Sequence, residues 1–262
     1  MHIINLCKYA YLLLMGIGAS AYMGLMIAIA IATAWLLSLI FLLGHPPTDS
    51  PIALVAEILL RTFLHTGLFV TAHDAIHGTI VPNEPVKNRW IGQIALSLYG
   101  FLPYKTCHRL HWQHHAHPAQ PQDPDFYPKP DGHLIQYFIQ WYCHFISSYL
   151  IWRNLGGIIT GIGLTTLSLI VVADVPLQNI ALFWILPWIL SSFQLFTFGI
   201  FLPHHTDSCR EPLRDSPHQP RSYYYPIVLS LLTCYHFGYH REHHSHPNIP
   251  WYQLPNLALG GQ

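Results

Sequence analysis

Four long apolar stretches dominate the chain and predict helices that span a membrane. They cover residues of about 20–43, 51–72, 155–172 and 180–202. About 17–25 apolar residues suffice for a helix to cross a hydrocarbon core, so each stretch is long enough. We therefore expect an all-α integral membrane protein with about four transmembrane helices. The apolar residues 3–18 either extend the first helix or lie at the membrane interface.

Two further apolar segments are too short or too polar to count as spans. We expect residues 90–102 to lie in the interface or to pack under a polar cap, and residues 133–152 to form an interfacial or partly inserted helix. The polar blocks, residues 73–133 and 204–262, are rich in histidine. Two spans precede the first block and two separate the blocks, so both lie on one side of the membrane. The whole chain, residues 1–262, is interpreted as a single membrane-embedded domain.

The composition agrees with a lipid-facing surface. Hydrophobic residues make up 52% of the chain and charged residues only 9%, whereas soluble domains carry about 25% charged residues. The net charge is zero with histidine neutral, which argues against nucleic acid as a partner. Within the second apolar stretch, Glu57 and Arg61 are spaced i,i+4 and are expected to pair on one helix face.

The distribution of lysine and arginine predicts the sidedness of the chain. Nine of the twelve basic residues lie in the histidine-bearing segments, whereas the turns at residues 44–50 and 173–179 contain none. Cytoplasmic loops of membrane proteins carry an excess of such residues. We therefore expect the histidine-rich cap on the cytoplasmic side of the lipid bilayer.

Most of the twenty histidines form dense clusters outside the spans. One H-x-x-x-H and two H-x-x-H-H patterns supply eight imidazoles: His73, His77, His111, His114, His115, His240, His243 and His244. Residues three and four apart share one helix face, so each cluster can present its rings to the same metal. Structural zinc sites close at four ligands, and eight imidazoles therefore predict two metal ions. Imidazole suits iron, copper and zinc alike, so the ligand type does not choose the metal.

Several further residues are candidates for roles around the metals. His204 lies just beyond the last span and could supply a ninth ligand. Metal-bound histidines usually donate their second N–H to a carboxylate or carbonyl, and four acids stand beside the clusters: Asp74, Asp123, Asp125 and Glu242. His236 and His218 are weaker candidates for such outer positions. No catalytic residue separate from the metal centre is indicated.

Beyond the histidine spacing, longer sequence words carry a resemblance to a known family. They are His-Asp-Ala-Ile-His-Gly at 73–78, Asp-Pro-Asp-Phe at 123–126, Phe-Leu-Pro-His at 201–204 and Tyr-His-Phe-Gly-Tyr-His-Arg-Glu-His-His at 235–244. The chain resembles the membrane desaturase and hydroxylase superfamily and, within it, the beta-carotene ketolases, over residues of about 70–255. Two departures are His205, where many relatives carry arginine, and the tyrosine-rich stretch 222–226; both could affect substrate preference.

The resemblance implies an activity and a di-iron centre. The eight clustered histidines correspond to the family's iron ligands, and His204 to the histidine of its Leu-Pro-His word. Two ferrous ions would use O2 and electrons from a carrier such as reduced ferredoxin. Two hydroxylations at C4 of a carotenoid ring, followed by loss of water, would give a ketone. A groove reached from the bilayer would hold the carotenoid, with candidate lining residues Trp112, Phe126, Tyr127, Tyr235 and Phe237.

Other functions remain in competition at this point. A carotenoid ring hydroxylase and a fatty-acyl desaturase of the same superfamily would carry the same histidines. A membrane zinc hydrolase is disfavoured because the H-E-x-x-H word is absent. A transporter is disfavoured because the polar residues gather outside the spans, with no pair of interrupted helices at mid-membrane depth.

Overall fold

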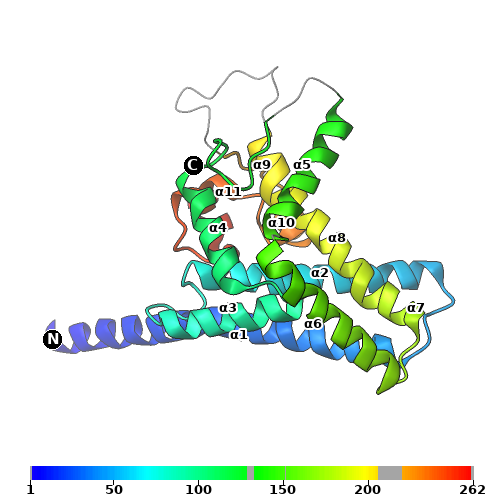
Figure 1. Cartoon of the computed structure of the whole chain (residues 1–262). Coiled ribbons are helices and arrows are strands. Elements are labelled where there is room, and N and C mark those ends of the chain that lie inside the picture. Colours follow the sequence, from blue (N-terminus) through cyan, green and yellow to red (C-terminus); the bar gives the residue numbers. More distant parts are fainter. Residues whose placement is uncertain (1, 129–132, 151, 206–219, 261–262) are drawn as a thin grey trace.

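The computed structural model describes residues 2–128, 133–150, 152–205 and 220–260, and the regular elements in these ranges are all helices (Figure 1). Four of them are long and apolar enough to cross a membrane, as predicted. The first is α1 (His2–Gly44), which is continuous, so residues 3–18 extend it. The second is α2 (Pro51–Ile76) and the third is α6 (Trp152–Val171).

The fourth span, Leu177–His204, is one helical rod with two wider turns in it. It consists of α7 (Leu177–Ile180), η1 (Ala181–Ile185), α8 (Leu186–Leu195), η2 (Phe196–Phe201) and α9 (Leu202–His204), where η1 and η2 are π-helical. Pro187 and Pro203 each follow a π-helical segment closely. Proline has no N–H for the carbonyl four residues earlier and its ring clashes with that carbonyl, so the wider turns accommodate both prolines.

Helix α2 begins and ends where local chemistry favours it. The Ser50 hydroxyl accepts a hydrogen bond from the Ala53 N–H (3.4 Å), and Pro51 occupies the first turn, where no N–H donor is needed. The helix ends four residues later than expected, at Ile76. His73 therefore lies on the last turn of the helix, and His77 caps it.

Residues 90–102 pack on α2 beneath the histidine-rich cap, the second of the two arrangements expected for them. They belong to α3 (Pro85–Gly100), which runs back along α2 (Figure 1). Gly92 lies against Ala75, and the Tyr99 carbonyl accepts a hydrogen bond from His65 Nε2 (2.7 Å), deep in the second span. Non-helical backbone is tolerated at that depth only where protein surrounds it. Phe101 forms the turn after α3 with a left-handed φ of 57°. Its N–H donates to the carbonyls of Leu96 and Ser97, so this backbone donor is satisfied within the protein.

The remaining helices build the cap around the ends of the spans. They are α4 (Tyr104–Ala116), α5 (Leu134–Tyr149), α10 (Ile227–Cys234), α11 (His240–Ser245), η3 (Trp251–Gln253) and α12 (Leu254–Gly260). Helix α5 buries Trp141 and Phe145 against Phe196 and Phe201. It thus packs on the half of the fourth span that ends at the histidine-rich cap.

Arg61 and Glu57 do not form the predicted ion pair. The Arg61 side chain is fully buried, and it donates from Nε to the Phe183 carbonyl (3.0 Å) and from Nη1 to the Trp35 carbonyl (2.6 Å). Phe183 stands four residues before Pro187, so its carbonyl has lost its normal helical donor and can accept from Arg61. The guanidinium therefore joins α1, α2 and the fourth span. In the described part of the chain, Glu57 Oε2 has no hydrogen-bond partner.

We expect Arg61→Met to destabilise the folded protein by about 3 kcal/mol, because it removes the donors of two buried carbonyls. Denaturant titration in detergent micelles measures this change. Glu57→Gln is the matched control and should alter the free energy of unfolding by less than about 0.5 kcal/mol. Equal losses of unfolding free energy from the two substitutions would support the originally predicted ion pair between Glu57 and Arg61.

Candidate metal centre

Histidines from four helices meet at one end of the bundle. The end of α2 supplies His73 and its cap His77, α4 supplies three histidines, and α9 and α11 supply the rest. Figure 1 shows α4, α9 and α11 grouped together at that end. The i,i+3 and i,i+4 spacings place the rings of each helix on the face that points to the other helices.

The first group of imidazoles consists of His73, His77, His111 and His243. One ring nitrogen from each lies within 4.8 Å of the others. His73 Nε2 is 3.1 Å from His243 Nε2, and His77 Nε2 is 2.6 Å from His111 Nε2. We call this set the first quartet.

The second quartet consists of His114, His204, His240 and His244, again with ring nitrogens within 4.8 Å of one another. The separations between neighbouring Nε2 atoms are 3.0 Å for His204 and His240, and 3.1 Å for His240 and His244. The pair formed by His244 and His114 is also 3.1 Å apart. His204 is thus a full member of this set, at the end of the fourth span.

His115 lies between the two quartets. Its Nε2 is 3.0 Å from His243 Nε2 of the first quartet, and its ring stacks on His244 of the second at a centroid distance of 4.2 Å. The structure therefore brings all nine predicted ligand residues together, as two sets of four with one ring between them.

Hydrogen bonds alone do not explain these close nitrogens. Each ring nitrogen of a neutral imidazole is either a single donor or a single acceptor, yet His240 Nε2 faces both His204 and His244 at hydrogen-bond distance. With metal–imidazole bonds of about 2.0–2.1 Å, adjacent ligands on one ion stand about 3.0–3.4 Å apart. Apart from the shorter contact between His77 and His111 (2.6 Å), the separations given for both quartets are close to this range, so the donor sets fit one metal ion each.

The electrostatics keep most of these rings in the neutral form that binds metal. Burial and the neighbouring imidazoles lower the pKa of His111, His240 and His243 well below the usual value. The pKa of His77 falls to about 3, mainly because of burial. His114 is the exception: burial alone would lower its pKa, but the hydrogen bond and charge of Asp123 raise it.

Asp123 orients one ring of the second quartet. Its two carboxylate oxygens lie 2.9 and 3.0 Å from His114 Nδ1, which leaves Nε2 of that ring facing the quartet. The same carboxylate accepts backbone N–H bonds from Ala119 and Asp125, which fix its position. In the first quartet, Asp74 Oδ1 stands 3.3 Å from His73 Nδ1, while its Oδ2 accepts from the Trp251 N–H. Each of the two acids thus faces the Nδ1 atom of one quartet histidine.

Three other outer candidates behave differently. Glu242 accepts hydrogen bonds from the hydroxyls of Ser222 and Tyr224, and the part of the chain described here places no imidazole on its carboxylate. The expectation that it orients a metal-binding ring is therefore wrong. His236 turns away as well, with its Nδ1 3.0 Å from the Ser230 hydroxyl. His218 lies outside the described residues.

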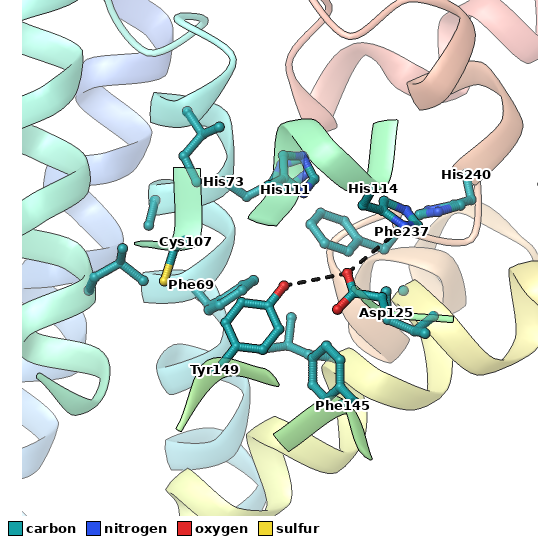
Figure 2. A pocket seen from close by; sticks show the side chains of 16 residues that line it. Phe69, His73, Cys107, His111, His114, Asp125, Phe145, Tyr149, Phe237 and His240 are labelled. Carbon is teal, nitrogen blue, oxygen red and sulfur yellow. Dashed lines mark hydrogen bonds and ion pairs between the residues drawn. The ribbon is translucent and has the colours of Figure 1, made fainter. Parts of the chain in front are cut away.

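Two cavities that share lining residues lie between the quartets and the apolar bundle. Figure 2 shows the side chains that line the inner one. The inner cavity touches both quartets through His73, His111, His114 and His240. The outer cavity continues to Tyr142, Trp188 and Ile189. Both are lined by Phe69, Phe145, Tyr149 and Leu195. The sequence does not single out these four residues, because each resembles an ordinary core position of its helix.

Only one of the predicted groove residues lines these cavities. Phe237 borders the inner cavity, with its ring 4.8 Å from that of His73. Trp112 packs edge-on against His77, on the outer side of the first quartet, and is 40% exposed. Phe126 lines neither cavity, and the same holds for Tyr127. These positions correct the predicted lining for Trp112, Phe126 and Tyr127.

Tyr235 also lines neither cavity, and its side chain instead fixes the turn between α10 and α11. Its φ of 46° is left-handed, as is the φ of 62° at the next residue, so the chain turns sharply between α10 and α11. The Tyr235 ring stacks on Phe63 at 4.4 Å, and its hydroxyl donates to the Phe63 carbonyl (3.1 Å). A Cβ on Gly67 would collide with this hydroxyl. The anchored turn aims the histidines of α11 at the quartets.

Comparison with known proteins agrees with this site. A family model described as "Fatty acid desaturase" matches residues 48–165 and 145–260, and the chain belongs to this family. A beta-carotene ketolase of Paracoccus sp. (strain PC1) is 40% identical over 232 residues, which are 87% of this chain and 86% of that protein. A zeaxanthin 4-ketolase of Chlamydomonas reinhardtii is 35% identical over 235 residues, 84% of this chain and 48% of that protein. Within the desaturase family, the relatives of the chain are thus carotenoid ketolases.

We expect Asp123→Asn to lower metal affinity about 10–100-fold, because it weakens the hydrogen bond that orients His114. Metal content after dialysis against a competing chelator measures the change. Glu242→Gln is the matched control, since that carboxylate bonds to two hydroxyls among the described residues, and it should retain the wild-type metal content. Equal metal loss in both variants would contradict the orienting role of Asp123.

His204→Ala and His205→Ala should differ sharply in metal content. His204 belongs to the second quartet, whereas the ring of His205 stacks on Phe201 at 4.9 Å, away from the quartets. We expect the first substitution to reduce bound metal by about one ion per chain and the second to leave it unchanged. Elemental analysis of the purified proteins decides between the two outcomes, and similar metal contents would exclude His204 as a ligand.

Proposed function

We propose that this chain is a di-iron oxygenase that converts the C4 methylene of a beta-carotene ring to a ketone. The observation that carries the proposal is the apolar cavity that ends on both histidine quartets. An apolar ring can enter it and place a ring carbon beside two adjacent metal ions. The relatives named as ketolases of beta-carotene and zeaxanthin support the same reaction.

The two quartets would hold one iron each, with His115 between them. Iron at these positions would supply the activation of O2 that hydroxylation of the allylic C4–H bond requires. The protein's own contribution is to fix the rings: Asp123 holds His114, Asp74 faces His73, and the turn at Tyr235 positions α11. Rigid positioning of this kind keeps the reacting carbon and the metals in register.

The overall reaction consists of two successive oxygenations at C4 and one dehydration. Each round uses one O2, two electrons and two protons, and converts a C–H bond to C–OH with release of one water. The second round gives a geminal diol at C4, which loses water and becomes the ketone. The apolar walls of the cavity exclude bulk water during these steps, and Phe69, Phe145 and Leu195 form much of that wall.

The outer cavity offers a path for the long polyene from the bilayer. It reaches Trp188 and Ile189 on the fourth span, and Ile189 is 43% exposed on the outer surface of the bundle. A carotenoid dissolved in lipid could enter there with one ring first, and the rest of the polyene would remain in the outer cavity and the membrane. This route requires no passage of the substrate through water.

The electrons would come from a small carrier such as reduced ferredoxin on the cytoplasmic side. The support is the cytoplasmic position proposed for the cap, which rests on the lysines and arginines of the histidine-bearing segments.

Expression of the chain in bacteria that produce beta-carotene should yield 4-keto carotenoids in an oxygen-dependent manner, detected by chromatography of the pigments.

The purified protein should contain about two irons per chain, because each quartet fits one ion. His243→Ala should abolish the ketones while the protein remains in the membrane. Unchanged pigments in cells that contain the intact protein would refute the proposed activity, and zinc-dominated active protein would refute the di-iron centre.

A further inference from the structure

One carboxylate in the inner cavity has an oxygen with no partner. Asp125 is 2% exposed and lines the cavity beside His114 (Figure 2). Its Oδ1 is buried and makes no hydrogen bond within the described structure. Its Oδ2 is 3.5 Å from the Tyr149 hydroxyl and 3.9 Å from His114 Nδ1. Burial of an unpaired acceptor is costly, so an occupant with a hydrogen-bond donor is expected.

The backbone of Asp125 is held independently of this side chain. Its N–H donates to Asp123 Oδ1 (2.8 Å), and its carbonyl accepts from the indole of Trp141 (2.6 Å). Asp123 has already taken His114 Nδ1, so the Asp125 carboxylate is not needed to orient that ring. The free oxygen is therefore available to the contents of the cavity.

The chemistry of the reaction provides a donor at the right moment. Beta-carotene is a hydrocarbon and offers Asp125 nothing, but the first oxygenation creates a hydroxyl at C4. This alcohol is also the species that must stay in the cavity for the second oxygenation. Near Asp125 the cavity is also lined by the rings of Phe145 and Phe237, which give a hydroxyl no acceptor, and by Tyr149, whose hydroxyl is turned toward Asp125 Oδ2.

We propose that Asp125 Oδ1 accepts a hydrogen bond from the C4 hydroxyl of the half-oxidised ring and retains it for the second oxygenation. This inference rests on the proposed ketolase activity. Asp125 makes and breaks no covalent bond here. It binds the alcohol more tightly than the hydrocarbon, and it holds the carbon that still carries a hydrogen at the metals. The result is a ketone in place of a released alcohol.

The test compares Asp125→Leu, which removes the acceptor, with Asp125→Asn, which keeps the shape and weakens the acceptor. Glu242→Gln is the control, because its carboxylate bonds to Ser222 and Tyr224 outside the cavity. In beta-carotene-producing cells, the ratio of 4-hydroxy to 4-keto products should rise at least about tenfold in the leucine variant, in line with loss of a buried hydrogen bond. The asparagine variant should show a smaller rise, and the control none. Iron content should stay near that of the wild type.

A binding measurement provides a second readout that needs no turnover. Tryptophan fluorescence of the metal-loaded proteins in detergent, without O2 or reductant, is titrated with beta-carotene and with a 4-hydroxy carotenoid. Asp125→Leu should weaken binding of the alcohol about tenfold and leave binding of the hydrocarbon unchanged. Equal affinities in wild type and variant for the alcohol would overturn the proposal, also when the variants are inactive.

Three further outcomes would count against it. Loss of iron in both Asp125 variants would make the residue a support of the metal site. A normal product ratio with beta-carotene would also overturn the proposal, and so would a defect confined to rings that already carry a C3 hydroxyl. By contrast, a wild-type protein that forms no C4-oxidised product would refute the proposed function, whereas the binding titration would still judge the role of Asp125.

Discussion

The structure depends on holding nine imidazole rings, most of them neutral, close together at one end of the helix bundle. Ring nitrogens about 3 Å apart direct their lone pairs at one another. Burial disfavours the protonated forms of these rings, whose positive charges would repel one another. Such an arrangement is stable only with a cation in each quartet or with a scaffold that prevents the rings from moving apart. Because the rings come from α2, α4, α9 and α11, the relative positions of four helix ends must be fixed within a fraction of an ångström.

The scaffold achieves this through local departures from regular helix geometry. Pro187 frees the Phe183 carbonyl, and the buried Arg61 uses it to join three spans. The left-handed residue Phe101 ends α3 inside the bundle, so that α4 starts there and returns to the cap. The left-handed turn at Tyr235, fixed on Phe63, aims α11 at the same place. Each irregularity is energetically unfavourable alone, and each serves to bring a histidine-bearing helix to the site.

The spans and the histidine clusters could be predicted because both follow from short-range rules. Hydropathy over about 20 residues defines a span, and i,i+3 and i,i+4 spacing defines a shared helix face. The partners of Arg61 could not be predicted, since Phe183 is 122 residues away and accepts only because of a proline. Asp123 and Glu242 stood equally close to clustered histidines in sequence, yet only the fold decides that one faces an imidazole and the other two hydroxyls. The cavity wall was missed for the same reason: it exists only where α2, α5 and the fourth span meet.

The short turn at residues 123–125 joins two tasks that could have been separate. One carboxylate faces a metal-binding ring and the next faces the cavity, and the N–H of the second bonds to the first. A mutation that reshapes this turn to suit another substrate would therefore disturb the metal centre at the same time. The part of the wall built by Phe69 of α2 and Leu195 of α8 carries no such coupling, because these two side chains have no polar group that could bond to the turn. Adaptation to new ring structures, in nature or by engineering, is accordingly expected to proceed on that wall.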